Sequence, residues 1–304
     1  MKKLCGILIV FILVLTSCNS ANSEDVKNDK PVIYTSIYPI SYIAENIVGE
    51  KIEIRNIVPN DTDIHSWELT PKDIVKIEDT NLVLTNGLGI ETWRESLVTT
   101  IGEDKLKEVN KGIDLINLVG ETGHEEHEHG EFDPHIWMSV KNMKIMASNV
   151  YEEIIKLDNK NEEDYLENFN RLIKDLDELE KSYESRLADY KGRYIIVPHE
   201  AFSYLARDYS LNQVAIEGIN SSSEPDLGKM AEIIDIAKKN NINTVFYEFE
   251  ESDKIAKAIA NEIEGKISPL YTLEVTTSEQ VKNKEDYISL MYKNLDNLEK
   301  SFGE

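Results

Sequence analysis

The chain has 304 residues, with 57 acidic against 33 basic side chains and a formal net charge of −24. This balance excludes nucleic acid as a partner, because contacts with phosphate require a positive protein surface. The two cysteines, Cys5 and Cys18, lie near the N-terminus, so the rest of the chain has no disulfide and no thiolate for a metal. Its length is sufficient for two ordinary domains.

The first 17 residues have the pattern of a signal peptide. Two lysines precede an apolar run at residues 6–15, which is too short to span a bilayer. Residues 15–18, Leu-Thr-Ser-Cys, resemble the lipobox of bacterial lipoproteins, although Ser17 is a less usual choice than Gly or Ala. The resemblance implies cleavage before Cys18 and a diacylglycerol on its sulfur. A plain signal peptide with a chance cysteine is the alternative.

Residues 18–30 lack apolar periodicity and predict a flexible, lipidated tether. From residue 31, apolar runs of strand length alternate with amphipathic segments, which is typical of βα units and a mostly parallel sheet. We therefore expect an N-terminal α/β lobe at 31–159. Its predicted strands are 32–36, 51–58, 81–85 and 106–109, and its predicted helices are 39–48, 71–79, 91–101 and 139–157.

Residues 160–190 predict one unusually long helix. Apolar side chains recur there at intervals of three and four, which forms a single stripe. At 1.5 Å per residue such a helix is roughly 45 Å long, enough to run along two lobes. A coiled-coil segment is the alternative, but the stripe is not strictly heptad and no second one follows.

The βα pattern restarts in residues 191–304, which predicts a second α/β lobe. One helix is expected to begin near Ser223 as N-cap, with Pro225 just inside, and to end near residue 239. The other predicted helices are 201–209, 253–263 and 286–302, and the predicted strands are 194–197, 213–216, 244–248 and 267–271.

Three of the six histidines, His65, His135 and His199, stand alone in short loop-like segments. Imidazole is a common ligand for zinc, but spacings of 70 and 64 residues are far from those of a zinc finger. Each segment lies at an edge of a predicted sheet where ligands bind in open α/β folds. Two come from the first lobe and one from the second, which predicts a metal site between the lobes.

The other three histidines, His124, His127 and His129, alternate with glutamates in a polar loop. Such a tract attracts cations. It is either a weak secondary zinc site that collects or senses metal, or a solvated loop without a role.

The sequence around these histidines resembles a known family. The segments VPNDTDIHSWELTPKDI, NGLGIETW, HGEFDPHIWMS and PHEAFSYLARDYSL are similar to the metal-binding lipoproteins of bacterial zinc and manganese ABC importers, known as cluster A-I or cluster 9 solute-binding proteins. The resemblance extends over nearly the whole chain after the signal. It implies two α/β lobes bridged by a rigid helix with the metal between them. Ile64 and Leu69 depart from it, since the family usually has proline at both places.

The resemblance implies that His65, His135 and His199 are three metal ligands and that a carboxylate from the second lobe completes the shell. Glu274 matches the place of that carboxylate. Glu248, at the end of another predicted strand, is the rival, and water is the third possibility. Three imidazoles with one carboxylate suit Zn²⁺, whereas Mn²⁺ prefers more oxygen ligands.

We therefore expect a monomeric carrier lipoprotein, not an enzyme, at the outer face of the bacterial cytoplasmic membrane. It would capture Zn²⁺ and deliver it to an ABC permease. Manganese or another divalent metal is the alternative cargo. A zinc hydrolase and a surface adhesin are the alternatives from other classes. The chain lacks an HExxH helix and a nucleophile elbow, and no sequence feature argues for adhesion.

If the two groups of histidines are separate sites, deletion of residues 123–129 should leave tight zinc binding intact. The measurement is a competition titration of both proteins against a chromophoric chelator. Loss of tight binding in the deletion variant would contradict the separation.

Overall fold

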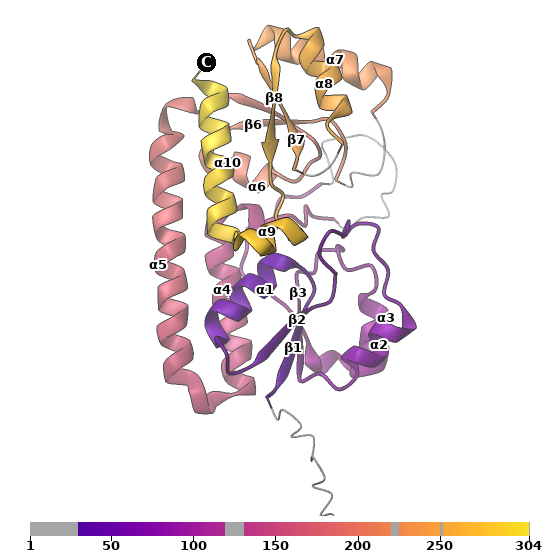
Figure 1. The fold of residues 1–304 in the computed structure, drawn as a ribbon, viewed down its shortest axis with the longest axis vertical. Coiled ribbons are helices and arrows are strands. Elements are labelled where there is room, and N and C mark those ends of the chain that lie inside the picture. The colour runs from indigo at the N-terminus through magenta and orange to yellow at the C-terminus, as the bar shows by residue number, and fades with distance from the viewer. Residues whose placement is uncertain (1–29, 119–130, 220–224, 250–251, 304) are drawn as a thin grey trace, which may run out of the picture. The chain divides into compact units, whose positions relative to one another are not determined.

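Two parallel sheets of four strands each form the framework of residues 31–304 in a computed structural model of the chain (Figure 1). The structure describes residues 30–118, 131–219, 225–249 and 252–303. The predicted class, α/β with two lobes and mostly parallel sheets, is confirmed. The signal peptide, Cys18, the tether and the three loop histidines lie outside the described residues.

The first sheet has the order β2-β1-β3-β4, with every pair parallel. Its central strands are apolar because both faces are covered, and Ile33 of β1 lies between Ile54 and Leu82 in register. Its strands are β1 Val32–Thr35, β2 Glu53–Asn56, β3 Leu82–Thr85 and β4 Leu106–Glu108, and its helices are α1 Tyr38–Val48, α2 Pro71–Ile77 and α3 Arg94–Ile101.

The second sheet repeats this winding with the order β6-β5-β7-β8. In both sheets the strand order switches sides after the first strand, between β1 and β3 and between β5 and β7, and ligands of open α/β sheets bind at the carboxyl ends of the strands beside such a switch. Its strands are β5 Tyr194–Val197, β6 Asn212–Ala215, β7 Thr244–Glu248 and β8 Lys266–Leu270. Its helices are α6 Ser203–Tyr209, α7 Leu227–Lys239, α8 Lys254–Glu262, α9 Ser278–Asn283 and α10 Tyr287–Phe302.

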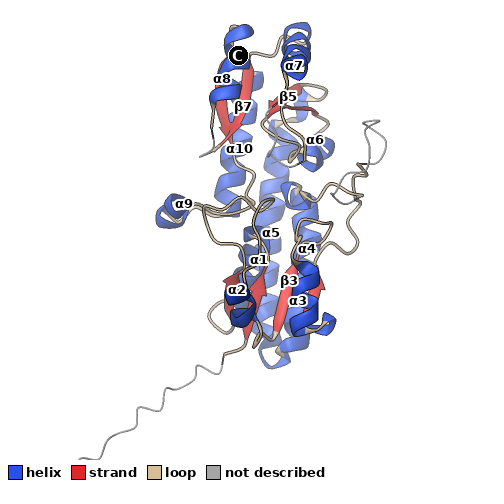
Figure 2. Ribbon diagram, turned by 90° about the vertical axis from the view of Figure 1, so that its right-hand side faces the viewer, coloured by secondary structure: helices blue, strands red, loops and turns tan. Residues whose placement is uncertain are grey.

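A long helix, α5 Glu162–Arg186, connects the two halves and follows α4 Val140–Leu157. It packs against α1 and α4 of the first half and α10 of the second, as Figures 1 and 2 show. The coiled-coil alternative is therefore wrong. The helix has 25 residues, about 38 Å, and is shorter than expected. Short 3₁₀ turns at Asn159–Asn161 and Ala188–Tyr190 flank it, and the helix ends where Leu187 leaves the helical conformation.

The structure differs from the predictions at the start of α7 and in an additional short helix, α9. The N-cap of α7 is Asp226, whose side chain accepts from the backbone N–H of Lys229, so Ser223 is not the cap. The prediction was wrong because Asp226 is also a favoured capping residue and lies closer to the first apolar residues of the helix. Helix α9 was not expected, since its 6 residues are too few to show periodicity. Its start is a capping box in which Thr277 and Gln280 satisfy each other's backbone N–H groups.

One continuous apolar cluster includes buried residues from both halves, among them Ile33, Leu176 and Leu295. Helix α5 contributes Tyr165, Leu172, Leu176, Leu179 and Tyr183. The two halves are thus joined by a shared core and not by the α5 backbone alone. In the described part of the chain, no helix has the length and apolar character required to cross a bilayer.

Replacing Leu176 by alanine should lower the free energy of unfolding by about 2–5 kcal/mol, because this side chain is 0% exposed and the change leaves a cavity. Urea denaturation measures the difference. Leu166→Ala on the same helix is the matched control, since Leu166 is 44% exposed and should cost less than about 0.5 kcal/mol. Equal losses would contradict the packing of α5.

Candidate metal site

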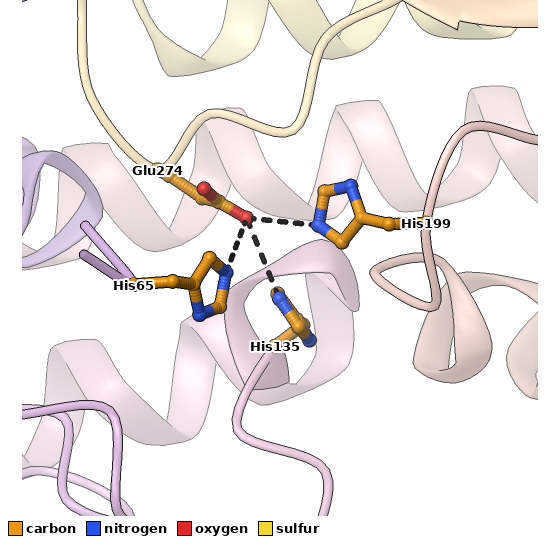
Figure 3. Close-up of side chains that lie close together, drawn as sticks. All are labelled: His65, His135, His199 and Glu274. Atoms are coloured by element: carbon orange, nitrogen blue, oxygen red, sulfur yellow. Dashed lines mark hydrogen bonds and ion pairs between the residues drawn. The ribbon is translucent and has the colours of Figure 1, made fainter. Parts of the chain in front are cut away.

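Four side chains from distant parts of the chain converge at one point (Figure 3). His65 lies in the turn between β2 and α2, where the buried neighbour Ile64 fixes the turn in the core. His135 directly precedes the 3₁₀ turn Ile136–Met138, His199 follows β5, and Glu274 lies in the segment after β8. The histidines and acid that the resemblance implied are therefore brought together.

The carboxylate oxygen Oε1 of Glu274 lies at the centre of the group. It is 3.6 Å from Nε2 of His65, 3.4 Å from Nε2 of His135 and 3.3 Å from Nε2 of His199. Bonds of about 2.0 Å around a tetrahedral ion place neighbouring ligand atoms about 3.3 Å apart. One ligand atom from each of the four residues lies within 4.8 Å of all the others. The three distances from Oε1 are thus close to the edge of such a tetrahedron, and the four ligand atoms are near enough to share one cation.

The four side chains are almost fully removed from water. His135 is 0% exposed, His199 1% and Glu274 7%. Nε2 of His65 and Nε2 of His135 make no well-formed hydrogen bond with any described residue. Buried polar atoms without partners are rare in native proteins and indicate a missing ligand. The unsatisfied imidazole nitrogens face the same carboxylate, as a cation site requires.

The carboxylates and imidazoles of the site shift one another's pKa values. Burial lowers the pKa of His135 and of His199, but hydrogen bonds and attraction from neighbouring carboxylates outweigh it, so both pKa values are raised, that of His199 well above its usual range. Burial raises the pKa of Glu274, yet the surrounding imidazoles hold it well below its ordinary value. The carboxylates and the imidazoles therefore each favour the charged form of the other.

Glu248, the rival fourth ligand, lies on the other side of His199. Its Oε2 is 3.3 Å from Nδ1 of His199, the ring nitrogen that faces away from Glu274. Asp133 has the corresponding place behind His135, with Oδ1 2.8 Å from Nδ1. Asp133 was not singled out in the sequence. The signal for it was the Asp-Pro-His order, which puts a carboxylate two residues before a buried histidine.

The segment that carries Glu274 is attached to the first lobe, although it follows a strand of the second. The backbone N–H of Tyr38 donates to the carbonyl of Glu274 at 3.2 Å, and that of Asp61 to Thr276 at 3.1 Å. Nε1–H of Trp137 donates to the carbonyl of Thr272 at 2.7 Å. Hydrogen bonds on both sides of Glu274 thus fix its carboxylate beside His65 and His135.

Known proteins with this fold and similar sequences exist. The high-affinity zinc uptake system protein ZnuA of Bacillus subtilis is 35% identical over 99% of this chain and 98% of its own length. The zinc-binding lipoprotein AdcA of Streptococcus pneumoniae is 30% identical over 99% of this chain, which spans 61% of that longer protein. Among solved structures, the Zn(II)-bound ZnuA-like domain of S. pneumoniae AdcA is 30% identical with a TM-score of 0.77 and covers 90% of this chain and 100% of that domain.

A second solved structure, the metal-dependent lipoprotein YcdH of Bacillus subtilis, is 32% identical with a TM-score of 0.78, over 90% of this chain and 99% of that one. Residues 33–301 match the family described as zinc-uptake complex component A, periplasmic. The match includes both sheets, the long helix and all four converging side chains. The chain therefore belongs to the zinc-uptake component A family of solute-binding transport proteins.

Proposed function

We propose that the protein captures Zn²⁺ between its lobes and delivers it to an ABC permease for import. The observation that carries this proposal is the arrangement of three buried imidazole nitrogens around Oε1 of Glu274, at distances of 3.3 to 3.6 Å. The proposed ligands are His65, His135, His199 and Glu274. Zinc is the cargo of the transport step, so the site binds it without changing it chemically.

Zinc is favoured over manganese by the type of ligand atom. Three nitrogens and one carboxylate match the tetrahedral shell of Zn²⁺, whereas Mn²⁺ prefers more oxygens. Manganese stays the second candidate, because one structural neighbour, at 25% identity, is the Mn-bound periplasmic metal-binding protein of Candidatus Liberibacter asiaticus. Glu248 does not add a second carboxylate to the proposed ligand set, since its Oε2 approaches Nδ1 of His199 and not the nitrogen that faces Glu274.

Capture is favoured over catalysis because four protein ligands occupy all positions of a tetrahedral ion. Hydrolytic zinc sites keep one position open for an activated water. We further propose that a lipid on Cys18 holds the protein, as a monomer, at the outer face of the cytoplasmic membrane. The adhesin alternative draws its support from the name of a structural neighbour, the laminin-binding protein Lbp of Streptococcus pyogenes, and from no feature of the described residues.

The purified protein should bind one Zn²⁺ tightly, and Mn²⁺ should not displace it at comparable concentration. Bound zinc should also raise the unfolding temperature, because a ligand that binds only the folded state stabilises it. Competition titration and thermal unfolding measure these effects. Displacement of zinc by equimolar manganese would assign the site to manganese.

Replacing Glu274 by glutamine should weaken zinc binding by more than the roughly 10–100-fold loss that follows removal of an outer partner of a ligand. The amide keeps the shape but removes the charge next to the cation. Glu279→Gln is the matched control, since Glu279 is exposed on α9 in the same segment. Equal zinc affinities of the two variants would exclude Glu274 as a ligand.

Zinc affinity should fall as the pH falls, and the decline should begin above the ordinary histidine pKa of about 6.5. The sign follows from the raised pKa values of His135 and His199: protonated imidazole cannot bind the cation, and a raised pKa extends protonation to higher pH. Titrations at several pH values, corrected for protonation of the chelator, test this. A constant affinity between mildly acid and neutral pH would contradict imidazole ligation.

A further inference from the structure

Two carboxylates outside the proposed ligand set, one buried and one partly buried, lie behind the imidazoles of His135 and His199. Asp133 is 0% exposed, and the Glu248 side chain is 12% exposed. Each approaches Nδ1 of its histidine, while Nε2 of the same ring faces Glu274. Neutral imidazole has one N–H and one lone pair, so a carboxylate at Nδ1 fixes the proton there and leaves the lone pair on Nε2.

We propose that Asp133 and Glu248 are positioning residues that set the tautomer and the direction of two zinc ligands, and that Asp133 has the larger effect. This inference rests on the proposed zinc site and deepens it. The acid that sequence reasoning offered as a rival ligand acts through His199 instead. An outer carboxylate also makes the imidazole a stronger donor, since it stabilises positive charge on the ring.

The geometry around Asp133 is the better defined of the two. Its Oδ1 accepts from Nδ1–H of His135 at 2.8 Å and from the backbone N–H of His135 at 2.9 Å. Its backbone carbonyl accepts from the hydroxyl of Tyr204 at 2.8 Å. The same residue thus holds the ring and the backbone of His135, while α6 of the second lobe holds Asp133.

The second oxygen of Asp133 has no donor among the described residues. Oδ2 is fully buried and makes no hydrogen bond there. A buried carboxylate with one oxygen unsatisfied costs stability, because the charge loses its hydration without full compensation. The ring of His135 is the group that Oδ1 contacts, at 2.8 Å, so the buried charge of Asp133 acts directly on a proposed zinc ligand.

Glu248 is held by Thr272, whose hydroxyl donates to Oε1 in a short hydrogen bond. The carbonyl of Thr272 in turn accepts from Trp137, two residues after His135. The distance from Oε2 of Glu248 to Nδ1 of His199 is 3.3 Å, and that nitrogen makes no well-formed hydrogen bond with a described residue. This longer contact is why Glu248 is assigned the smaller effect.

The test compares zinc affinity in Asp133→Asn, Asp133→Ala and Glu248→Gln with that of the native protein. We expect about a 10-fold loss for Asp133→Asn, which removes only the charge, and about a 100-fold loss for Asp133→Ala, which also removes the acceptor. Glu248→Gln should lose less than Asp133→Asn. Nitrogen NMR of the zinc-loaded proteins should show His135 protonated at Nδ1 in the native chain and a disturbed ring signal in Asp133→Ala.

Asp208→Asn is the matched control. The side chain of Asp208 is 6% exposed and accepts a hydrogen bond from Ser139, but it contacts none of the four proposed ligands. This variant should keep native zinc affinity within about twofold, by the usual range of substitutions remote from a site. Asp133→Asn without metal should unfold at the native temperature within a few degrees, which separates positioning from a structural defect.

Three results would overturn the positioning role: native affinity in both Asp133 variants, equal losses in Asp133→Asn and Asp208→Asn, or an unchanged His135 ring signal in Asp133→Ala. Failure of the proposed function looks different. In that case the native chain itself would not bind zinc tightly, and His135→Ala would make no difference. Tight native binding that is lost in His135→Ala but unaffected at Asp133 would reject the positioning role alone.

Discussion

The proposed site depends on one carboxylate being held against three imidazoles from remote segments. Glu274 contributes Oε1 at 3.3 to 3.6 Å from each Nε2, yet it lies on a loop that follows the last strand of the second sheet. That loop reaches the other lobe because its backbone bonds to Tyr38 and Asp61 and because Thr272 accepts from Trp137. Without these contacts the three histidines would have no central charge.

The long helix explains why segments so far apart can be aligned to within ångströms. Helix α5 packs against α1 and α4 at one end and α10 at the other, and its stripe belongs to a core shared by both halves. Close-packed interiors resist deformation, so the frame limits how far the lobes can separate. The hydroxyl of Tyr287 on α10 even donates to the carbonyl of Trp137, next to the proposed site.

Much of this could be read from the sequence, for identifiable reasons. Apolar runs of strand length located the eight strands of the described residues. Isolated histidines near strand ends indicated the site, because parallel strands bring their carboxyl ends to one edge. The resemblance added Glu274. The contacts that depend on tertiary structure could not be predicted. Asp133 meets Nδ1 of His135 only in the folded loop. Glu248 and Glu274 are both acids near His199, and they differ in which ring nitrogen they approach. The spacing of residues in the sequence does not predict which nitrogen each acid approaches.

The proposed site concentrates charge in the interior of the protein. Asp133, Glu248 and Glu274 place three nearly buried carboxylates around three imidazoles, and uncompensated charge in an interior is costly. The neighbouring carboxylates raise the pKa of His135 and of His199, so these rings attract protons more strongly than free imidazole does. A cation at the proposed site needs Nε2 of each ring without its proton, so protons and the cation compete for the same negative charge. Removal of one of these carboxylates would therefore weaken the attraction for both.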